Sequence, residues 1–121
     1  MKDVYKQTLL FDFYGELLTD HQKDVYSEYI LDDLSISEIS EELGISRQGV
    51  HDLIKRCTKI LEEYEEKLGL ISRFQNVKLK VSDIDKVIQN INKSNEIKKD
   101  KKIKSELDKI EGLTKDILEE L

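Results

Sequence analysis

Apolar residues recur along most of the chain at the three- and four-residue spacing of one face of an α-helix, and no run alternates as a strand would. Near the N-terminus this spacing predicts a helix over residues 4–18. Its apolar face consists of Leu10, Phe13, Tyr14, Leu17 and Leu18. The pattern therefore predicts an all-α protein.

Two capping boxes divide the next segment into helices. Thr19 with Gln22, and Ser35 with Glu38, have the spacing in which two side chains satisfy free backbone N–H groups at a helix start. They predict one helix over residues 19–31 and a short helix from residue 36 that ends at Gly44. The apolar face of the 19–31 helix consists of Val25, Tyr26, Tyr29 and Ile30.

Two long heptad-like rows follow. Ser46 is predicted to cap a helix that meets no stop signal before Gly69, and its apolar row consists of Val50, Ile54, Cys57, Leu61, Tyr64 and Leu68. A second row of the same spacing closes the chain and consists of Ile103, Leu107, Ile110, Thr114, Ile117 and Leu121. Because such rows pack against other helices, the pair motivates the hypothesis of a homodimer.

A further helix is predicted to start at Ser82, where the residues S-D-I-D resemble a helix N-terminus. Its predicted apolar face consists of Ile84, Val87, Ile88 and Ile91. Asn and Ser residues over 90–95 weaken helix propensity and indicate a joint. We therefore expect a helix-turn-helix domain over residues 1–75 and a C-terminal helical extension over residues 76–121.

Residues 36–55 have the pattern of a helix-turn-helix, in which a short helix crosses the start of a second helix at a steep angle. The crossing requires apolar residues at fixed positions, and these are Ile39, Leu43, Ile45, Val50 and Leu53. Gly44 lies where the tight turn is needed, and the small Ser40 lies where the two helices approach each other.

If this motif binds DNA, the first turn of its second helix faces the major groove. The candidate nucleic-acid-binding residues are Ser46, Arg47, Gln48, His51, Lys55, Arg56 and Lys59. Arg47 suits a bidentate contact with guanine and Gln48 one with adenine, each worth about 1–3 kcal/mol of discrimination. The three basic residues of 55–59 suit phosphates, whereas Asp52 would repel them unless Arg56 pairs with it.

Two alternatives remain open for this stretch. Arg47 and Gln48 also fit an ordinary solvated first turn, with the motif serving only as a packing unit. Gly49 indicates the close approach of another backbone, either that of a nucleic acid or that of the preceding helix, and packing is the simpler interpretation.

Charge is distributed unevenly over the chain, which carries −6 in total. Residues 1–34, 62–72 and 105–121 are acidic, with net charges of −5, −3 and −4. Residues 35–61 are neutral, whereas residues 73–104, with ten Lys and Arg against four Asp and Glu, carry +6. The acidic total lowers the expected non-specific affinity for DNA but leaves a local binding face open.

The sequence offers little for other chemistry. His21, His51 and Cys57 have no ligand-like spacing, so no metal site is expected, and Cys57 lies in an apolar row as a core residue would. Without a Gly-rich phosphate loop or a nucleophile–base pattern, we expect no enzyme, no cofactor and no small-molecule substrate. The single cysteine and the lack of any long apolar run predict a soluble cytoplasmic protein without a membrane partner.

The stretch LLTDHQKDVYSEYILDDLSISEISEELGISRQGVHDLIKRCTKIL (17–61) resembles the fourth region of bacterial sigma factors. That resemblance implies a helix-turn-helix with Arg47, Gln48 and His51 in base-facing positions.

A closer resemblance, over roughly residues 1–75, is to the bacterial YlxM family of helix-turn-helix proteins associated with the signal recognition particle pathway. DFYGELLT (12–19), YILDDLS (29–35) and SRQGVHDLIKR (46–56) carry it. The chain departs from that family at Gly49 and His51, where Ala and Tyr are more common.

Three functions follow from these observations. The first is a DNA-binding regulator that uses the 46–59 face, acting in the signal recognition particle pathway. The second is an accessory protein that binds the RNA or the GTPase of that particle through the basic 73–104 segment. The third is a protein–protein adaptor in which the motif only packs. The Lys-rich Lys98–Lys104 stretch is most simply a solvated face or linker.

Overall fold

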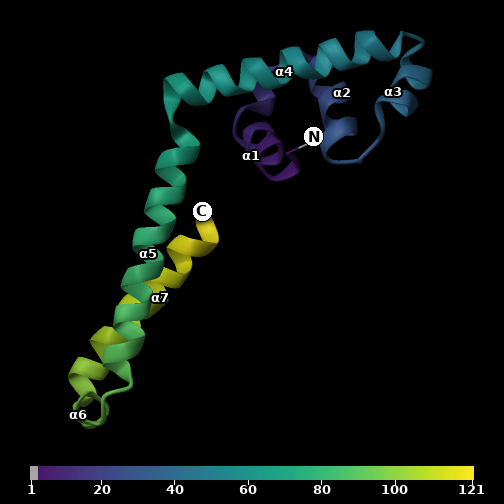
Figure 1. Cartoon of the computed structure of the whole chain (residues 1–121). Coiled ribbons are helices and arrows are strands. Elements are labelled where there is room, and N and C mark those ends of the chain that lie inside the picture. Colours follow the sequence, from purple (N-terminus) through teal and green to yellow (C-terminus); the bar gives the residue numbers. More distant parts are fainter. Residues whose placement is uncertain (1–2) are drawn as a thin grey trace. The chain divides into compact units, whose positions relative to one another are not determined.

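The computed structural model describes residues 3–121 and, over that range, contains helices and no strand (Figure 1). The predicted all-α fold class is confirmed. Packing divides the chain into two units, residues 1–71 and residues 72–121.

The first unit is built around one long helix. Its elements are α1 (Val4–Tyr14), the 3-10 helix η1 (Gly15–Leu17), α2 (Asp20–Ile30), α3 (Ile36–Leu43) and α4 (Arg47–Leu68). Figure 1 shows α1, α2 and α3 along one side of α4. The buried core between them consists of Leu10, Tyr14, Leu18, Val25, Tyr26, Ile30, Ile39, Val50, Ile54, Cys57, Leu61 and Ile71. The heptad-like row of α4 is thus buried by helices of its own unit, except that Leu68 is exposed. This row therefore does not serve as a dimer surface.

Local capping fixes where these helices begin and end. The Thr19/Gln22 and Ser35/Glu38 capping boxes are both formed, as predicted. Gly44 and Gly69 adopt left-handed backbone conformations, with φ of 69° and 62°, and end α3 and α4.

The helix predicted over residues 4–18 ends earlier, at Tyr14. The chain tightens into η1 and is extended at Leu18, just before the cap of α2. This change of direction leaves Leu17 exposed and Leu18 buried, so the prediction that Leu17 is a core residue was wrong.

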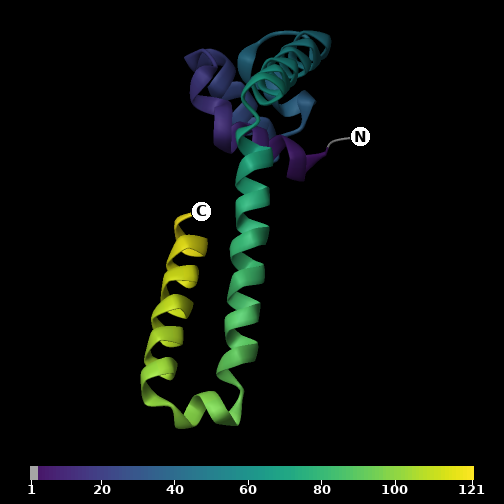
Figure 2. The same ribbon diagram turned by 90° about the vertical axis from the view of Figure 1, so that its left-hand side faces the viewer.

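The second unit contains most of α5 (Leu70–Asn92), together with α6 (Asn95–Lys99) and α7 (Lys101–Glu120). Helices α5 and α7 run side by side in opposite directions and form a hairpin closed by α6 (Figure 2). The predicted joint over residues 90–95 lies at the end of α5.

The predicted start at Ser82 was wrong, because α5 begins at Leu70 and Ser82 lies inside it. Side chains from elsewhere in the first unit satisfy the first backbone N–H groups of α5. Leu70 donates to the Tyr14 hydroxyl (3.2 Å) and Ile71 donates to Glu65 Oε1 (2.9 Å). Tyr14 in turn donates to Glu65 at 2.5 Å.

The predicted apolar face of this helix was also wrong in part. Ile88 is buried, but Ile84, Val87 and Ile91 are exposed. In α7 the polar Thr114 is buried, whereas four apolar members of its row are exposed. These four are Ile103, Ile110, Ile117 and Leu121. The hairpin therefore turns a different face inward from the one that apolarity alone predicts.

Candidate nucleic-acid interface

Helices α3 and α4 form the helix-turn-helix. Ile39 and Val50 are fully buried where the helices cross, and Leu43 and Leu53 are half-buried and pack against this core. Ile45 was expected in the same core but is 42 % exposed, because it lies in the turn after Gly44.

The turn is held by hydrogen bonds from small side chains. The Ser40 hydroxyl donates to the Ile45 carbonyl at 2.5 Å. This small residue therefore pairs a backbone carbonyl of the turn and also leaves room for the turn. Ser46 caps α4 by accepting a hydrogen bond from the Gly49 N–H at 3.0 Å. The start of α4 is thereby fixed relative to α3.

All seven predicted nucleic-acid-binding residues are exposed, and they lie between the N-cap of α4 and a point just past its middle. They are Ser46, Arg47, Gln48, His51, Lys55, Arg56 and Lys59. The buried face of the helix carries Val50, Ile54 and Cys57, and Gln48, Lys55 and Lys59 lie roughly opposite to it.

The candidates lie on two flanks of α4. Lys55, His51 and Lys59 line one concavity of about 610 Å³, together with Gln7, Tyr29 and Ile36 from the other helices. Arg56 lines a separate concavity of about 400 Å³ beside Thr19, His21 and Gln22 of the α2 start. The structure thus brings His51, Lys55 and Lys59 together and holds Arg56 apart from them.

Asp52 lies among these candidates and contacts two of them. Gln48 Nε2 donates to Asp52 Oδ1 at 2.9 Å, and His51 Nδ1 lies 3.8 Å from the same oxygen. The sequence suggested Arg56 as the partner of Asp52, but its contacts are with Gln48 and His51. A bidentate contact of Gln48 with adenine uses both atoms of its amide, so it requires this hydrogen bond to break.

Gly49 has a different structural setting from the one expected. The atoms nearest to a Cβ added there are Ser46 Oγ, at 3.2 Å, and Ile45 Cδ1, at 3.7 Å. Both belong to the turn, so the close packing at Gly49 is against the turn and not against the α3 backbone.

A second basic cluster lies at the closed end of the hairpin. Lys98, Lys101, Lys104 and Lys109 surround a shallow concavity of about 470 Å³, with Ser105 and Asp108. The sequence did not predict Lys109 as part of this cluster. It lies eight residues, or about two helical turns, after Lys101 on α7. Asp100 caps α7 within this stretch by accepting hydrogen bonds from the Lys102 and Ile103 N–H groups.

Other chemical groups are sparse in the described range. Among residues 3–121, no group of three or more His, Cys, Asp or Glu residues is arranged to hold a metal ion. Cys57 is fully buried, and burial raises the pKa of its thiol to about 11. Across the same residues, none of the helices combines the length and the apolar character needed to span a membrane.

Comparison with known proteins identifies the family. The profile described as "Putative helix-turn-helix protein, YlxM / p13 like", of the UPF0122 family, matches residues 1–110. The chain belongs to the UPF0122 family. The YlxM resemblance of the sequence is therefore confirmed, and the match extends well past residue 75.

Two relatives show how far the similarity reaches. A UPF0122 protein of Thermoanaerobacter sp. (strain X514) is 52% identical over 87 residues, covering 72% of this chain and 74% of the relative. A UPF0122 protein of Acetivibrio thermocellus is 43% identical over 119 residues, covering 98% of this chain and 99% of the relative. The hairpin unit is therefore part of what this chain shares with a relative.

Proposed function

We propose that the protein is a cytoplasmic DNA-binding regulator that places the first turn of α4 in the major groove. One observation carries this proposal: the seven candidate residues are exposed, while α3 and the core hold the apolar face of α4. Segment 35–61 has no net charge, so the acidic total does not oppose binding at this face.

The proposed contacts follow from side-chain chemistry. Arg47 and Gln48 lie in the first turn, where free backbone N–H groups and the helix dipole also favour phosphate oxygens. In this arrangement Arg47 and Gln48 contact base edges, and His51 lies one turn further along the groove. The phosphate contacts come from Lys55, Arg56 and Lys59.

A duplex-binding titration with substitutions tests this proposal. We expect binding to weaken with salt at a slope of about −0.9 per phosphate contacted. Arg47→Ala and Gln48→Ala should lower the preference for a selected sequence over random duplex. Lys67→Ala is a matched control for Arg47→Ala, because it removes one positive charge from the far end of α4. Equal effects of Arg47→Ala and Lys67→Ala would contradict sequence reading by the first turn.

The lysine cluster of the hairpin favours a second candidate function. It is that of an accessory protein binding the RNA or the GTPase of the signal recognition particle, because shape-based RNA binding needs basic surface. Replacing Lys98, Lys101 and Lys104 with Gln should abolish this binding while Arg47→Ala leaves it intact. The reverse pattern would refute the second candidate and support the first.

Recovery of nucleic acid crosslinked to the protein in cells separates both candidates from a protein–protein adaptor. DNA supports the first function, RNA supports the second, and neither supports the adaptor. We also propose a homodimer, in which two recognition helices would contact two half-sites, although a monomer could contact one.

A further inference from the structure

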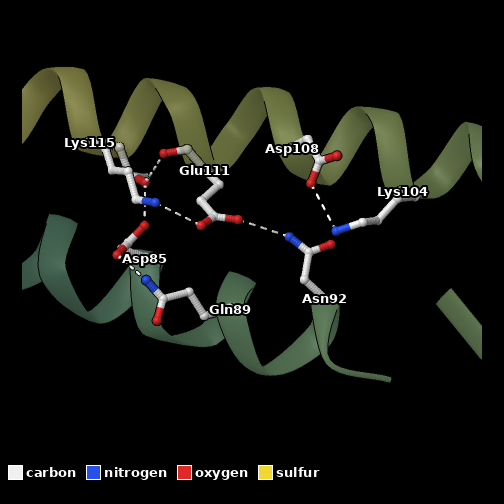
Figure 3. A network of polar contacts seen from close by, with 8 residues as sticks. Asp85, Gln89, Asn92, Lys104, Asp108, Glu111 and Lys115 are labelled. Carbon is white, nitrogen blue, oxygen red and sulfur yellow. Dashed lines mark hydrogen bonds and ion pairs between the residues drawn. The ribbon is translucent and has the colours of Figure 1, made fainter. Parts of the chain in front are cut away.

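The inward face of the α5–α7 hairpin includes several polar side chains. Thr114 Oγ1 donates to Asp85 Oδ1 at 2.9 Å. Asn92 Nδ2 donates to Glu111 Oε2 at 3.1 Å (Figure 3). The buried apolar side chains of this unit are Val81 and Ile88. So small an apolar core gives two helices little stability on their own.

Each helix of the hairpin also carries an exposed apolar row. On α5 the row consists of Val77, Ile84 and Ile91, and on α7 it consists of Ile103, Ile110 and Ile117. Leu113 and Val87 extend the two rows, and all eight side chains are between 39 and 61 % exposed. The first and last residues of each row are 14 positions apart, which is about 21 Å of helix. The two rows therefore match in length.

The two rows lie on the same side of the hairpin. On both helices an exposed residue follows an inward-facing residue by three positions, as Ile84 follows Val81 and Ile117 follows Thr114. A step of three residues rotates about 60° backward around a helix, in the same sense on each helix. Because α5 and α7 are antiparallel and face each other, equal rotations bring both rows to one side.

The hydrogen bonds show which residues of α5 and α7 lie at the same level, that is, at the same height along the hairpin. Asp85 lies opposite Thr114 and Asn92 lies opposite Glu111, so residue numbers at one level add up to about 200. A second copy related by a twofold axis parallel to the helices keeps these levels and places α5 against α7 of the second copy.

This twofold axis places apolar residues of α5 opposite apolar residues of α7 of the second copy. It places Ile84 level with Ile117 of the second copy, and Ile91 level with its Ile110. At the outer edge of the same contact, Val87 meets Leu113 of the second copy. Apolar residues thus meet apolar residues over residues 84–91 of α5 and 110–117 of α7, whereas Val77 and Ile103 lie beyond this overlap.

Charge favours the same arrangement. Lys80 lies one heptad before Val87, at the same outer edge of the contact. It is level with Glu120 of the second copy, so opposite charges meet there. The other face-to-face arrangement would place α5 against α5. Residues 70–92 carry four Lys and Arg against two Asp and Glu, so that arrangement brings two basic helices together.

From this self-complementarity we infer that the exposed apolar face of the α5–α7 hairpin binds a second copy of this chain, forming a four-helix bundle with α5 against α7 of the partner. The inference specifies the surface of the proposed homodimer. It does not require DNA binding, so its failure and that of the proposed function are distinguishable.

Sedimentation of the full chain at tens of micromolar is the first test, and we expect a dimer. Ile84→Gln and Ile117→Gln should each raise the dimer Kd at least tenfold while helix content by circular dichroism is retained. Leu79→Gln is the matched control. Leu79 is also exposed, at 64 %, but lies on the other side of α5, so its substitution should leave the dimer Kd unchanged.

A charge exchange tests the pairing itself. Lys80→Glu and Glu120→Lys should each weaken the dimer several-fold, and the double variant should restore it, because the pair is exchanged across both copies of the interface. Lys86→Glu makes the same charge change away from the proposed face and should have no effect.

Disulfide formation reports the arrangement. A mixture of Val87→Cys chains with Leu113→Cys chains should crosslink, whereas the unsubstituted chain should not, because Cys57 is buried. A monomer at these concentrations, or Val87→Cys chains that crosslink mainly with each other, would overturn the inference.

Discussion

Asp52 is the residue whose charge most directly opposes the proposed DNA contact. It lies on the exposed face of α4 and accepts a hydrogen bond from Gln48 Nε2, the atom that an adenine contact would use. Its carboxylate would also repel nearby phosphates. Removing this charge should therefore favour DNA binding in two ways. It weakens the hydrogen bond that holds Gln48, and it removes the repulsion between Asp52 and the phosphates.

We predict that Asp52→Asn increases the affinity for duplex DNA several-fold at low salt, with a smaller gain at high salt. Fluorescence anisotropy of a labelled duplex measures the change. Glu66→Gln removes the same charge about 21 Å further along α4 and is the control. An equal gain in both variants would indicate a general charge effect and count against a contact at Asp52.

Cys57 illustrates a residue whose setting the sequence predicted correctly. Its place in the apolar row of α4 indicated a core residue, and it is fully buried. Burial is the main cause of its raised pKa, about 11, with Arg56 lowering that pKa in part. The thiolate is thus disfavoured in the folded state near neutral pH.

We predict that a disulfide reagent such as dithionitrobenzoate modifies native Cys57 at pH 8 at least a hundredfold more slowly than it modifies the unfolded chain. The raised pKa contributes stability that is fully present below the unfolded pKa of about 8.5 and is lost as pH rises toward 11. The modification rate should therefore rise steeply in that alkaline range. Rapid modification at pH 8 would contradict a buried thiol.

At the scale of elements, the sequence predicted those helix ends whose signals are local. The capping boxes of α2 and α3 and the left-handed Gly44 and Gly69 each need only a few neighbouring residues. The start of α5 was missed because its stabilising groups, Tyr14 and Glu65, are brought there by the fold.

We predict that Gly44→Ala destabilises the protein by about 1–2 kcal/mol. No atom lies within 4 Å of an added Cβ, so the cost comes from the positive φ alone. Gly44→Asn should cost less, because Asn adopts this conformation more readily. Urea unfolding measures both, and equal costs would contradict a conformational origin.

The junction at the start of α5 gives a second test at this scale. Tyr14→Phe removes the hydroxyl that donates to Glu65 and accepts from Leu70, at an expected cost of about 1–2 kcal/mol. Hydrogen exchange of the Leu70 amide should be faster in Tyr14→Phe, because its N–H loses its acceptor. Tyr5→Phe alters an exposed tyrosine and should change neither quantity. Unchanged exchange at Leu70 in Tyr14→Phe would refute the capping role.

At the scale of the whole molecule, charge and apolar surface are distributed over different elements. The DNA-binding candidates lie on α4, the lysine cluster lies at the closed end of the hairpin, and the apolar rows lie along α5 and α7. Each proposal can therefore be tested by substitutions that leave the other surfaces intact.

The sequence predicted the helix-turn-helix far better than the hairpin. In residues 36–55 the apolar residues pack into the core where α3 and α4 cross, so their spacing identifies the buried face. Ile45 is the exception. On α5 and α7 the apolar residues exceed what one hairpin interface buries, and the hydrogen bonds of Asp85 and Asn92 select the inward face. Spacing alone does not reveal such a selection.

The most direct test of the proposed function is a titration of the full-length, ¹⁵N-labelled protein with duplex DNA, followed by the amide shifts of each residue. We predict that the largest changes fall on residues 46–59, from the N-cap of α4 to just past its middle, and diminish as salt is added. Changes confined to residues 93–109 of the hairpin, or no change at a saturating duplex concentration, would contradict the proposal that α4 binds DNA.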